Sequence, residues 1–175
     1  FILQRAMSFM GSSVTVSITN EIDLERIARI LASALPSHAM IALEGDLGAG
    51  KTTFTKFLGA AIGIPSNEIV SPTFGLIHIH QGPTQLTHID AFRLSGVEDL
   101  EQLGWDEIIS QCGWVIVEWP SRIAVALPDD RLTVSIEVTG ETSRRITLFS
   151  ESSRFDGAID ALLIATHDGR FMETP

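Results

Sequence analysis

One eight-residue segment of the chain matches in full the phosphate-binding loop pattern G-x-x-x-x-G-K-[ST]: Gly45-Asp46-Leu47-Gly48-Ala49-Gly50-Lys51-Thr52. In such a loop, glycines let the backbone turn until successive N–H groups point inward around a phosphate. The lysine then reaches the β- and γ-phosphates, and the threonine hydroxyl binds magnesium. Only two lysines occur in the chain, so chance rarely produces this match. We predict that the following residues bind a nucleoside triphosphate: Asp46, Leu47, Gly48, Ala49, Gly50, Lys51, Thr52 and Thr53.

The residues on both sides of this loop support the prediction. Residues 38–44 form an apolar run typical of a short buried strand, and residues 52–62 are expected to form a helix. A helix N-terminus attracts an anion, because its first N–H groups have no partner within the helix. Strand, loop and helix therefore occur in the order that a phosphate site needs.

Length and composition indicate one globular domain. A chain of 175 residues with 45% hydrophobic residues suits a single α/β domain. No apolar run approaches the roughly 18 residues of a membrane helix, and the single cysteine, Cys112, is compatible with a reducing cytosol. We expect a cytoplasmic protein without membrane association. Residues 1–12 are set apart as an N-terminal extension, natural or added for expression, residues 13–165 as the domain, and residues 166–175 as a C-terminal tail.

The charge of the chain argues against a direct grip on nucleic acid. Lys and Arg number 12 against 22 Asp and Glu, which gives a formal net charge of −10. Proteins that bind nucleic acid by themselves normally cluster basic residues against the phosphates. The one dense basic pair, Arg144-Arg145, lies in an expected strand, where a solvated face is the favoured interpretation. If the chain acts on RNA or DNA, another subunit is expected to make most of the contact.

The rest of the chain alternates between expected strands and helices. Predicted strands cover residues 14–18, 38–44, 76–80, 85–90, 114–118, 131–138 and 143–150, and predicted helices cover residues 20–35, 52–62, 97–103 and 152–165. Residues 76–90 are expected to form a hairpin around Gly82-Pro83. The fold class is α/β, a P-loop NTPase-like three-layer sandwich whose mixed central sheet carries added antiparallel strands.

Two acids stand where they could complete a nucleotide site. Asp90 and Glu118 each follow a short apolar run, and ligands of open α/β sheets lie beyond the carboxyl ends of the strands. A phosphate-binding loop needs such an acid for magnesium and a group that orients the attacking water. Trp119 follows Glu118 and is either packed or functional. Ser71-Pro72-Thr73 is either a turn or a loop that senses the γ-phosphate.

Three histidines and one arginine are further candidate site residues. His78, His80 and His88 lie in the expected hairpin, where cross-strand packing or surface exposure is favoured over a metal site. Arg93 is placed to pair with Asp90 or with phosphate, or to form a surface ion pair.

Four segments together resemble the TsaE family. They are the phosphate-binding loop, Ser71-Pro72-Thr73-Phe74, His88-Ile89-Asp90-Ala91-Phe92-Arg93 and Val117-Glu118-Trp119-Pro120, and they span roughly residues 19–150. The family consists of small bacterial ATPases that assist formation of threonylcarbamoyladenosine, a modified base beside the tRNA anticodon. Phe92 departs from the pattern, because the family usually has tyrosine there.

The resemblance implies roles for individual residues. It implies that Lys51 and Thr52 hold phosphates and Mg²⁺, with Glu118 as a further metal ligand. Asp90 would orient water or act in catalysis, and Thr73 would sense the γ-phosphate. Trp119 is implied to matter for activity and is counted among the nucleotide-binding residues. ATP is the implied substrate, and the implied partners are the TsaB and TsaD proteins, through which tRNA would be reached indirectly.

Two other functions stay open at this point. The same scaffold supports a small-molecule or nucleotide kinase, although residues 104–130 contain only one arginine, Arg122, and no arginine-rich lid. A binding switch, in which nucleotide state controls docking without essential turnover, is the other. A GTPase is disfavoured, because the chain has no Asn-Lys-x-Asp motif for guanine.

Overall fold

The computed structural model describes residues 4–8, 11–72 and 76–167, with eight strands among them in one sheet. Along this sheet the strand order is β1-β2-β8-β7-β3-β6-β5-β4. The strands are β1 (Gln4–Ser8), β2 (Gly11–Ile18), β3 (Ala39–Glu44), β4 (Ile77–His80), β5 (Leu86–Asp90), β6 (Trp114–Glu118), β7 (Leu132–Val138) and β8 (Arg144–Ser150). The expected α/β class and mixed sheet are confirmed.

The centre of the sheet is parallel and its two margins are antiparallel. Strands β7, β3, β6 and β5 run parallel, so their carboxyl ends share one edge. The antiparallel hairpin β4–β5 closes one margin, and β1, β2 and β8 form the other. Strands β3 and β6 are buried almost throughout, as continuous apolar strands covered on both faces should be.

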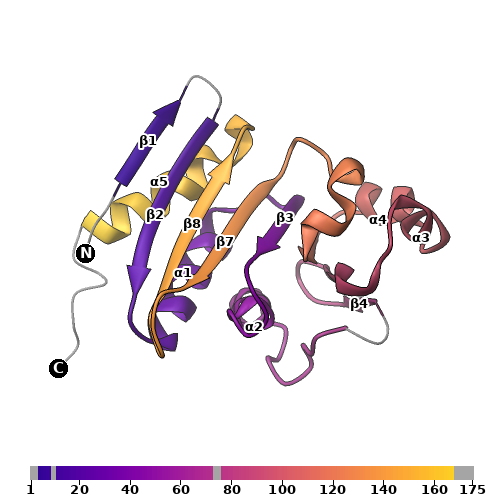
Figure 1. Ribbon diagram of the computed structural model, residues 1–175, viewed down its shortest axis with the longest axis horizontal. Helices are drawn as coiled ribbons and strands as arrows, with labels where there is room; N and C mark the ends of the chain where they lie inside the picture. Colours follow the sequence, from indigo (N-terminus) through magenta and orange to yellow (C-terminus); the bar gives the residue numbers. More distant parts are fainter. Residues whose placement is uncertain (1–3, 9–10, 73–75, 168–175) are drawn as a thin grey trace.

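The larger core lies between the sheet and three helices. These helices are α1 (Glu21–Ala34), α2 (Lys51–Ala61) and α5 (Asp156–His167). The Asn20 side chain caps α1 by accepting a hydrogen bond from the Asp23 N–H, while apolar residues such as Ile27 and Leu31 face the sheet. Figure 1 shows α1 and α5 behind the antiparallel strands, and α2 below β3.

A second, smaller core covers the opposite face of the parallel strands. It contains α3 (Val97–Gln102), α4 (Trp105–Ser110) and the 3-10 turns η1 (Ala91–Arg93) and η2 (Pro120–Ala126). Alternate residues of β6 divide between the two cores, with Ile116 in the larger and Val117 in the smaller. The parallel half of the sheet is therefore the middle layer of three.

The structure adds elements that the sequence analysis did not predict. Strand β1 lies within residues 1–12, which were set apart as an extension, and it pairs with β2 at the margin of the sheet. Helix α4 follows α3 after Gly104, whose φ of +74° lets the chain turn between them. The domain boundaries themselves remain predictions.

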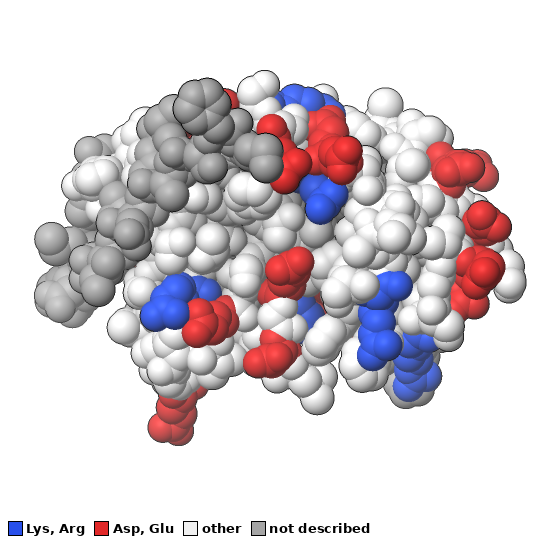
Figure 2. All heavy atoms as spheres, turned by 45° about the horizontal axis from the view of Figure 1, so that its top comes forward, with Lys and Arg blue, Asp and Glu red and all other residues white. Residues whose placement is uncertain are grey.

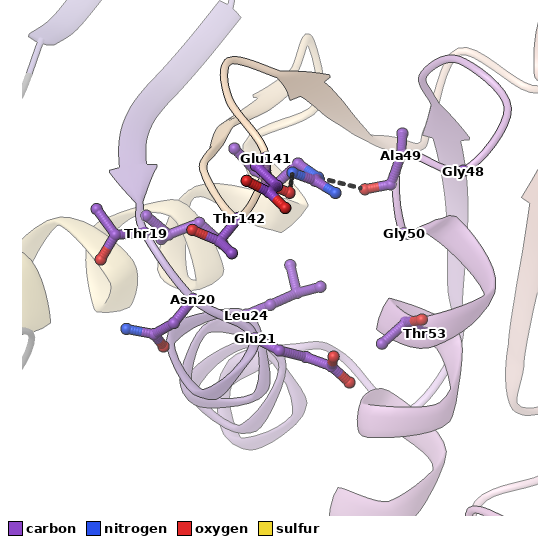
Figure 3. Close-up of a pocket in the computed structure, with 12 residues that line it drawn as sticks. Thr19, Asn20, Glu21, Leu24, Gly48, Ala49, Gly50, Thr53, Glu141 and Thr142 are labelled. Atoms are coloured by element: carbon purple, nitrogen blue, oxygen red, sulfur yellow. Dashed lines mark hydrogen bonds between the residues drawn. The ribbon is translucent and has the colours of Figure 1, made fainter.

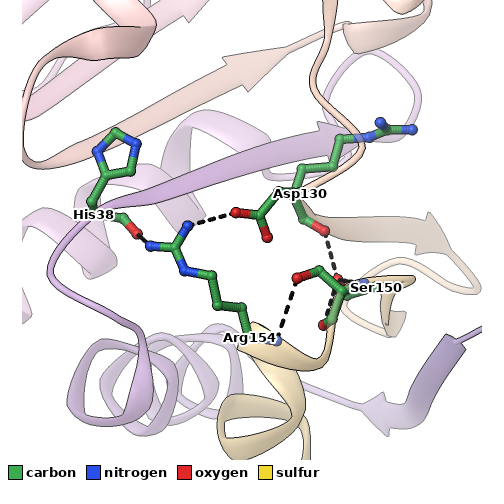
Figure 4. A network of polar contacts seen from close by, with 6 residues as sticks. His38, Asp130, Ser150 and Arg154 are labelled. Atoms are coloured by element: carbon green, nitrogen blue, oxygen red, sulfur yellow. Dashed lines mark hydrogen bonds and ion pairs between the residues drawn. The ribbon is translucent and has the colours of Figure 1, made fainter.

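A network of hydrogen bonds connects the segment before α5 to the residues that precede β3 and β7. This segment is the 3-10 turn η3 (Ser153–Phe155), which carries Arg154. The Arg154 guanidinium donates to the Asp130 carboxylate at 2.5 Å and to the His38 carbonyl at 2.6 Å (Figure 4). Ser150 Oγ donates to the Arg131 carbonyl at 2.8 Å. These contacts join the chain just before β3 and β7 to the last helix, at the edge opposite the phosphate-binding loop.

Replacing Gly113 with alanine is expected to lower the free energy of unfolding by about 2 to 4 kcal/mol. Its φ is +120°, and a Cβ there would lie 2.4 Å from the Gln85 carbonyl oxygen, which accepts the Trp114 N–H. Urea denaturation measures the effect. Gly157→Ala in α5 is the control, because its Cβ would meet no atom within 4 Å. The free energy of unfolding of this control should rise by about 0.5 to 1 kcal/mol. An equal rise for Gly113→Ala would contradict the expectation.

Candidate nucleotide site

The loop between β3 and α2 has the backbone shape that its sequence predicts. Gly45, Gly48 and Gly50 have φ values of +144°, +76° and +114°, a region that favours glycine. A Cβ on Gly45 would also lie 2.4 Å from the Ile136 carbonyl oxygen on β7. The predicted helix begins at Lys51, so its unpaired N–H groups face the loop. The backbone of the loop therefore has a conformation that suits a bound anion.

Lys51 lies folded over this loop. Its Nζ donates to the Gly45 carbonyl at 2.7 Å and to the Asp46 carbonyl at 2.9 Å. Burial lowers the pKa of this ammonium group, while the Glu118, Asp90 and Asp46 carboxylates act in the opposite direction. Because a phosphate would add negative charge beside Nζ, it would favour the charged form further.

The two predicted acids lie side by side at the carboxyl edge of the sheet. Asp90 at the end of β5 is the register partner of Glu118 at the end of β6, and both are buried. Both therefore point to the face of the sheet that α2 covers, as residues paired across parallel strands share a face. Thr52 Oγ1 donates to Glu118 Oε1 at 2.7 Å. The structure thus brings together the two residues predicted to hold magnesium.

Two of the described residues donate hydrogen bonds to the Asp90 carboxylate. Its Oδ2 accepts the Ser71 hydroxyl at 3.0 Å, and its Oδ1 accepts the Phe92 N–H at 3.0 Å. Ser71 belongs to the segment that was expected to sense the γ-phosphate, and this contact joins it to the acid. Thr73, the residue named for that role, lies outside the described residues, and its role stays a prediction.

Trp119 packs its indole ring against Lys51. Its φ of +59° lies in the left-handed region, which is rare for a bulky residue. This conformation places the indole ring 3.9 Å from Lys51 Nζ, within range of a cation–π contact. The centroid of the Phe92 ring lies 5.0 Å from that of the indole ring. Two aromatic rings and the lysine therefore form one wall.

These residues line a cavity of about 380 Å³. Its walls contain most of the predicted binding residues together with two further ones, Ser71 and Phe92. The complete lining is Leu47, Gly48, Gly50, Lys51, Thr52, Thr53, Ser71, Asp90, Phe92, Glu118 and Trp119. Oxygen ligands from one hydroxyl and one carboxylate suit Mg²⁺, which takes its remaining ligands from phosphate and water. The donor set at Thr52 and Glu118 therefore fits the expected metal.

A second cavity, of about 440 Å³, adjoins the first across the loop and shares Gly48, Gly50 and Thr53 with it. Figure 3 shows it between the start of α1, with Asn20 and Leu24, and the turn that carries Glu141. Both polar and apolar side chains line this second cavity. A ligand held by the loop could therefore extend into either cavity.

Arg144 corrects one interpretation made from the sequence. The Arg144-Arg145 pair was assigned to a solvated face, which holds for Arg145, an exposed residue paired with Glu137 at 2.7 Å. It is wrong for Arg144, whose Nε donates to the Ala49 carbonyl at 3.1 Å. Because β8 returns beside β7, its first residue reaches the phosphate-binding loop 95 positions earlier. The arginine thus braces the loop and lines the second cavity.

His88 is a site residue that sequence reasoning missed. The predicted cross-strand packing is present, because His88 lies opposite His78 in the hairpin register. However, His88 is fully buried, and its Nε2 lies 2.8 Å from Glu118 Oε1. The sequence did contain an indication of this role. His88 lies two residues before Asp90, and alternate residues of a strand lie on the same face.

The described residues on the face drawn in Figure 2 form no extended basic patch. Over the described part of the face drawn in Figure 2, basic side chains lie in small separate groups among acidic ones. Across residues 4–8, 11–72 and 76–167, no helix has the length and apolar character needed to span a bilayer.

Comparisons with known proteins identify the family of the chain. The family model described as threonylcarbamoyl adenosine biosynthesis protein TsaE matches residues 18–146. A TsaE protein of Treponema pallidum is 36% identical over 126 residues, which cover 72% of this chain and 93% of the relative. A TsaE protein of Bacillus subtilis is 35% identical over 150 residues, covering 85% and 92%. The crystal structure of Bacillus subtilis YdiB superposes with a TM-score of 0.74 at 31% identity, covering 92% of this chain and 99% of that one. The chain therefore belongs to the TsaE family.

Proposed function

We propose that the chain is a magnesium-dependent ATPase that acts in the formation of threonylcarbamoyladenosine in tRNA. Its family and its curated relatives are named for this biosynthesis. The observation that carries the catalytic part is the contact of Thr52 Oγ1 with Glu118 Oε1 at 2.7 Å beside the phosphate-binding loop. This contact joins the hydroxyl of the loop motif to an acid 66 residues later in the chain. A nucleotide–metal site requires such a pair of groups.

The two cavities suit the two halves of ATP. In this proposal the triphosphate lies over the loop, with the γ-phosphate toward Asp90 in the first cavity. The nucleoside then lies in the second cavity, where Leu24 supplies apolar contact and Asn20 supplies polar contact. Volumes of about 380 and 440 Å³ are each within the usual range for small-molecule sites.

The residues of the chain would act mainly by positioning and by charge. Lys51 and the N–H groups at the start of α2 face the negative charge that develops on the transferring phosphoryl group. Asp90, whose carboxylate accepts hydrogen bonds from Ser71 and from the Phe92 N–H, would accept another from the attacking water. Magnesium, when held by Thr52 and Glu118, would neutralise charge on the β- and γ-phosphates. Trp119 and Phe92 would limit the access of bulk water.

We propose that hydrolysis drives or resets a partner complex, with TsaB and TsaD as the partners. Support comes from the acidic chain, whose formal net charge of −10 leaves tRNA contact to another subunit. Leu47 at the tip of the loop is 86% exposed, so a partner that touches the site would meet an apolar side chain. Turnover by the chain alone should be slow, because partners often order such sites.

The test is phosphate release from Mg-ATP by the purified protein, alone and with TsaB and TsaD added. Slow release that changes when the pair is added would support the proposal. Release that ignores the pair, despite measured ATP binding, would contradict the partner role. Transfer of phosphate to an added acceptor would establish a kinase instead. Partner affinity that differs between ATP and ADP, with function intact in a hydrolysis-dead variant, would establish the switch.

A further inference from the structure

His88 is the one histidine at the candidate site, and the proposed chemistry leaves it without a role. It lies in β5, is fully buried, and shares a face of the sheet with Asp90. Its register partners are His78 on β4 and Ile116 on β6, so the ring is set between neighbours on both sides. A polar ring in such a place needs a physical reason, since burying polar groups is unfavourable unless they are hydrogen-bonded.

The ring is directed at a single acceptor, Glu118. His88 Nε2 lies 2.8 Å from Glu118 Oε1, and the tautomer with its proton on Nε2 satisfies a carboxylate, which only accepts. Within the described ranges, His88 Nδ1 is buried and has no hydrogen-bond partner. Leaving one buried ring nitrogen unpaired is unfavourable. The contact with Glu118 is therefore the one polar interaction of the ring that the structure shows.

Glu118 Oε1 is held from two directions. Thr52 Oγ1 donates from the start of α2 at 2.7 Å, and His88 Nε2 donates from β5. Glu118 itself is 3% exposed, so these donors replace water around the carboxylate. The two donors are not equivalent, because the Thr52 hydroxyl rotates and is itself predicted to bind the metal. A ring held between β4 and β6 has no such freedom.

We propose that His88 is a positioning residue, which holds the Glu118 carboxylate in place for the metal while the Thr52 hydroxyl changes its partner. This inference rests on the proposed function, because it assigns Glu118 to the metal. Partners behind a ligating carboxylate typically change metal affinity by about 10- to 100-fold when removed. The role lies in orientation, so it depends on a donor at this place and not on the imidazole as such.

The experiment measures Mn²⁺ binding in the presence of ADP by the loss of the free Mn²⁺ electron paramagnetic resonance signal. His88→Leu removes the donor and keeps an apolar side chain of similar bulk, and we expect Mn²⁺ to bind about 10-fold more weakly. His88→Gln restores an N–H donor, and we expect affinity within about 3-fold of the parent. His78→Gln is the control on the adjacent strand and should leave Mn²⁺ affinity unchanged. Thermal unfolding of each variant establishes that it is folded.

The outcomes separate this inference from the proposed function. Parent-like Mn²⁺ binding by folded His88→Leu would overturn the role of His88. Equal losses in His88→Gln and His88→Leu would also overturn it, because they would show that the ring matters for packing and not as a donor. If His88→Leu fails to fold, His88→Met, which also lacks a donor, takes its place, and parent-like Mn²⁺ binding by folded His88→Met would equally overturn the role of His88. A parent protein that binds ADP but never Mn²⁺ would instead contradict the metal-dependent function.

Discussion

Replacing Lys51 with alanine is expected to weaken ATP binding by about 10- to 100-fold and to lower turnover by about 100-fold or more. In the structure, Lys51 Nζ donates to two loop carbonyls, at 2.7 and 2.9 Å, and lies over the Trp119 ring. A bound triphosphate would give it charge-assisted hydrogen bonds, each worth about 1.5 to 3 kcal/mol. Titration with a fluorescent ATP analogue measures binding, and phosphate release measures turnover.

The chain offers a matched control for this experiment in its second lysine. Lys56 lies five residues further along α2 and does not line either nucleotide cavity. Lys56→Ala therefore changes the net charge equally and should leave binding and turnover near those of the parent. Equal weakening by both substitutions would point to general electrostatics and would contradict a specific phosphate contact of Lys51.

Replacing Glu118 with alanine is expected to cut turnover by about 100-fold while ATP binding without metal changes by no more than a few-fold. The carboxylate is proposed to act through the metal, and it contacts Thr52 and His88 in the structure. Its loss therefore removes a contribution that matters mainly when charge develops in the transition state. Phosphate release at saturating Mg-ATP, together with nucleotide titration in EDTA, separates the two effects.

Glu137 provides the comparison for Glu118. It lies on β7, two strands away, and its carboxylate pairs with Arg145 on an exposed surface. Such exposed pairs contribute at most about 1 kcal/mol, so Glu137→Ala should retain parent turnover. Near-normal turnover in folded Glu118→Ala would remove Glu118 from the metal role and would leave Asp90 as the acid to examine.

The sequence predicted those parts of the site that depend on local order along the chain. The phosphate-binding loop follows a strand and opens a helix, and both elements are confirmed. The hairpin at residues 76–90 and the late pair of strands are also confirmed. Asp90 and Glu118 were placed at strand ends by their apolar runs alone, and the structure makes them register partners. Their chemical roles remain predictions.

What the sequence did not predict depends on contacts between distant segments. His88 meets Glu118 because β5 and β6 are parallel neighbours, and Arg144 meets Ala49 because β8 returns beside the loop. Neither pairing follows from periodicity within one segment. Helix α3 was predicted over residues 97–103 and is confirmed, whereas the six residues of α4 give no clear helical period and were missed.

The order of strands in the sheet also bears on how the protein is made. Strand β3 delivers the phosphate-binding loop early in the chain, yet it pairs only with β6 and β7. Ala39 pairs with Trp114, which is synthesised 75 residues later (114 − 39). Ile41 pairs with Leu132, which is synthesised 91 residues later (132 − 41). On a ribosome that adds about 5 to 20 residues each second, β3 stays unpaired for several seconds as an apolar segment open to chaperones. The loop would thus take its final shape only after β7 has emerged and paired with β3.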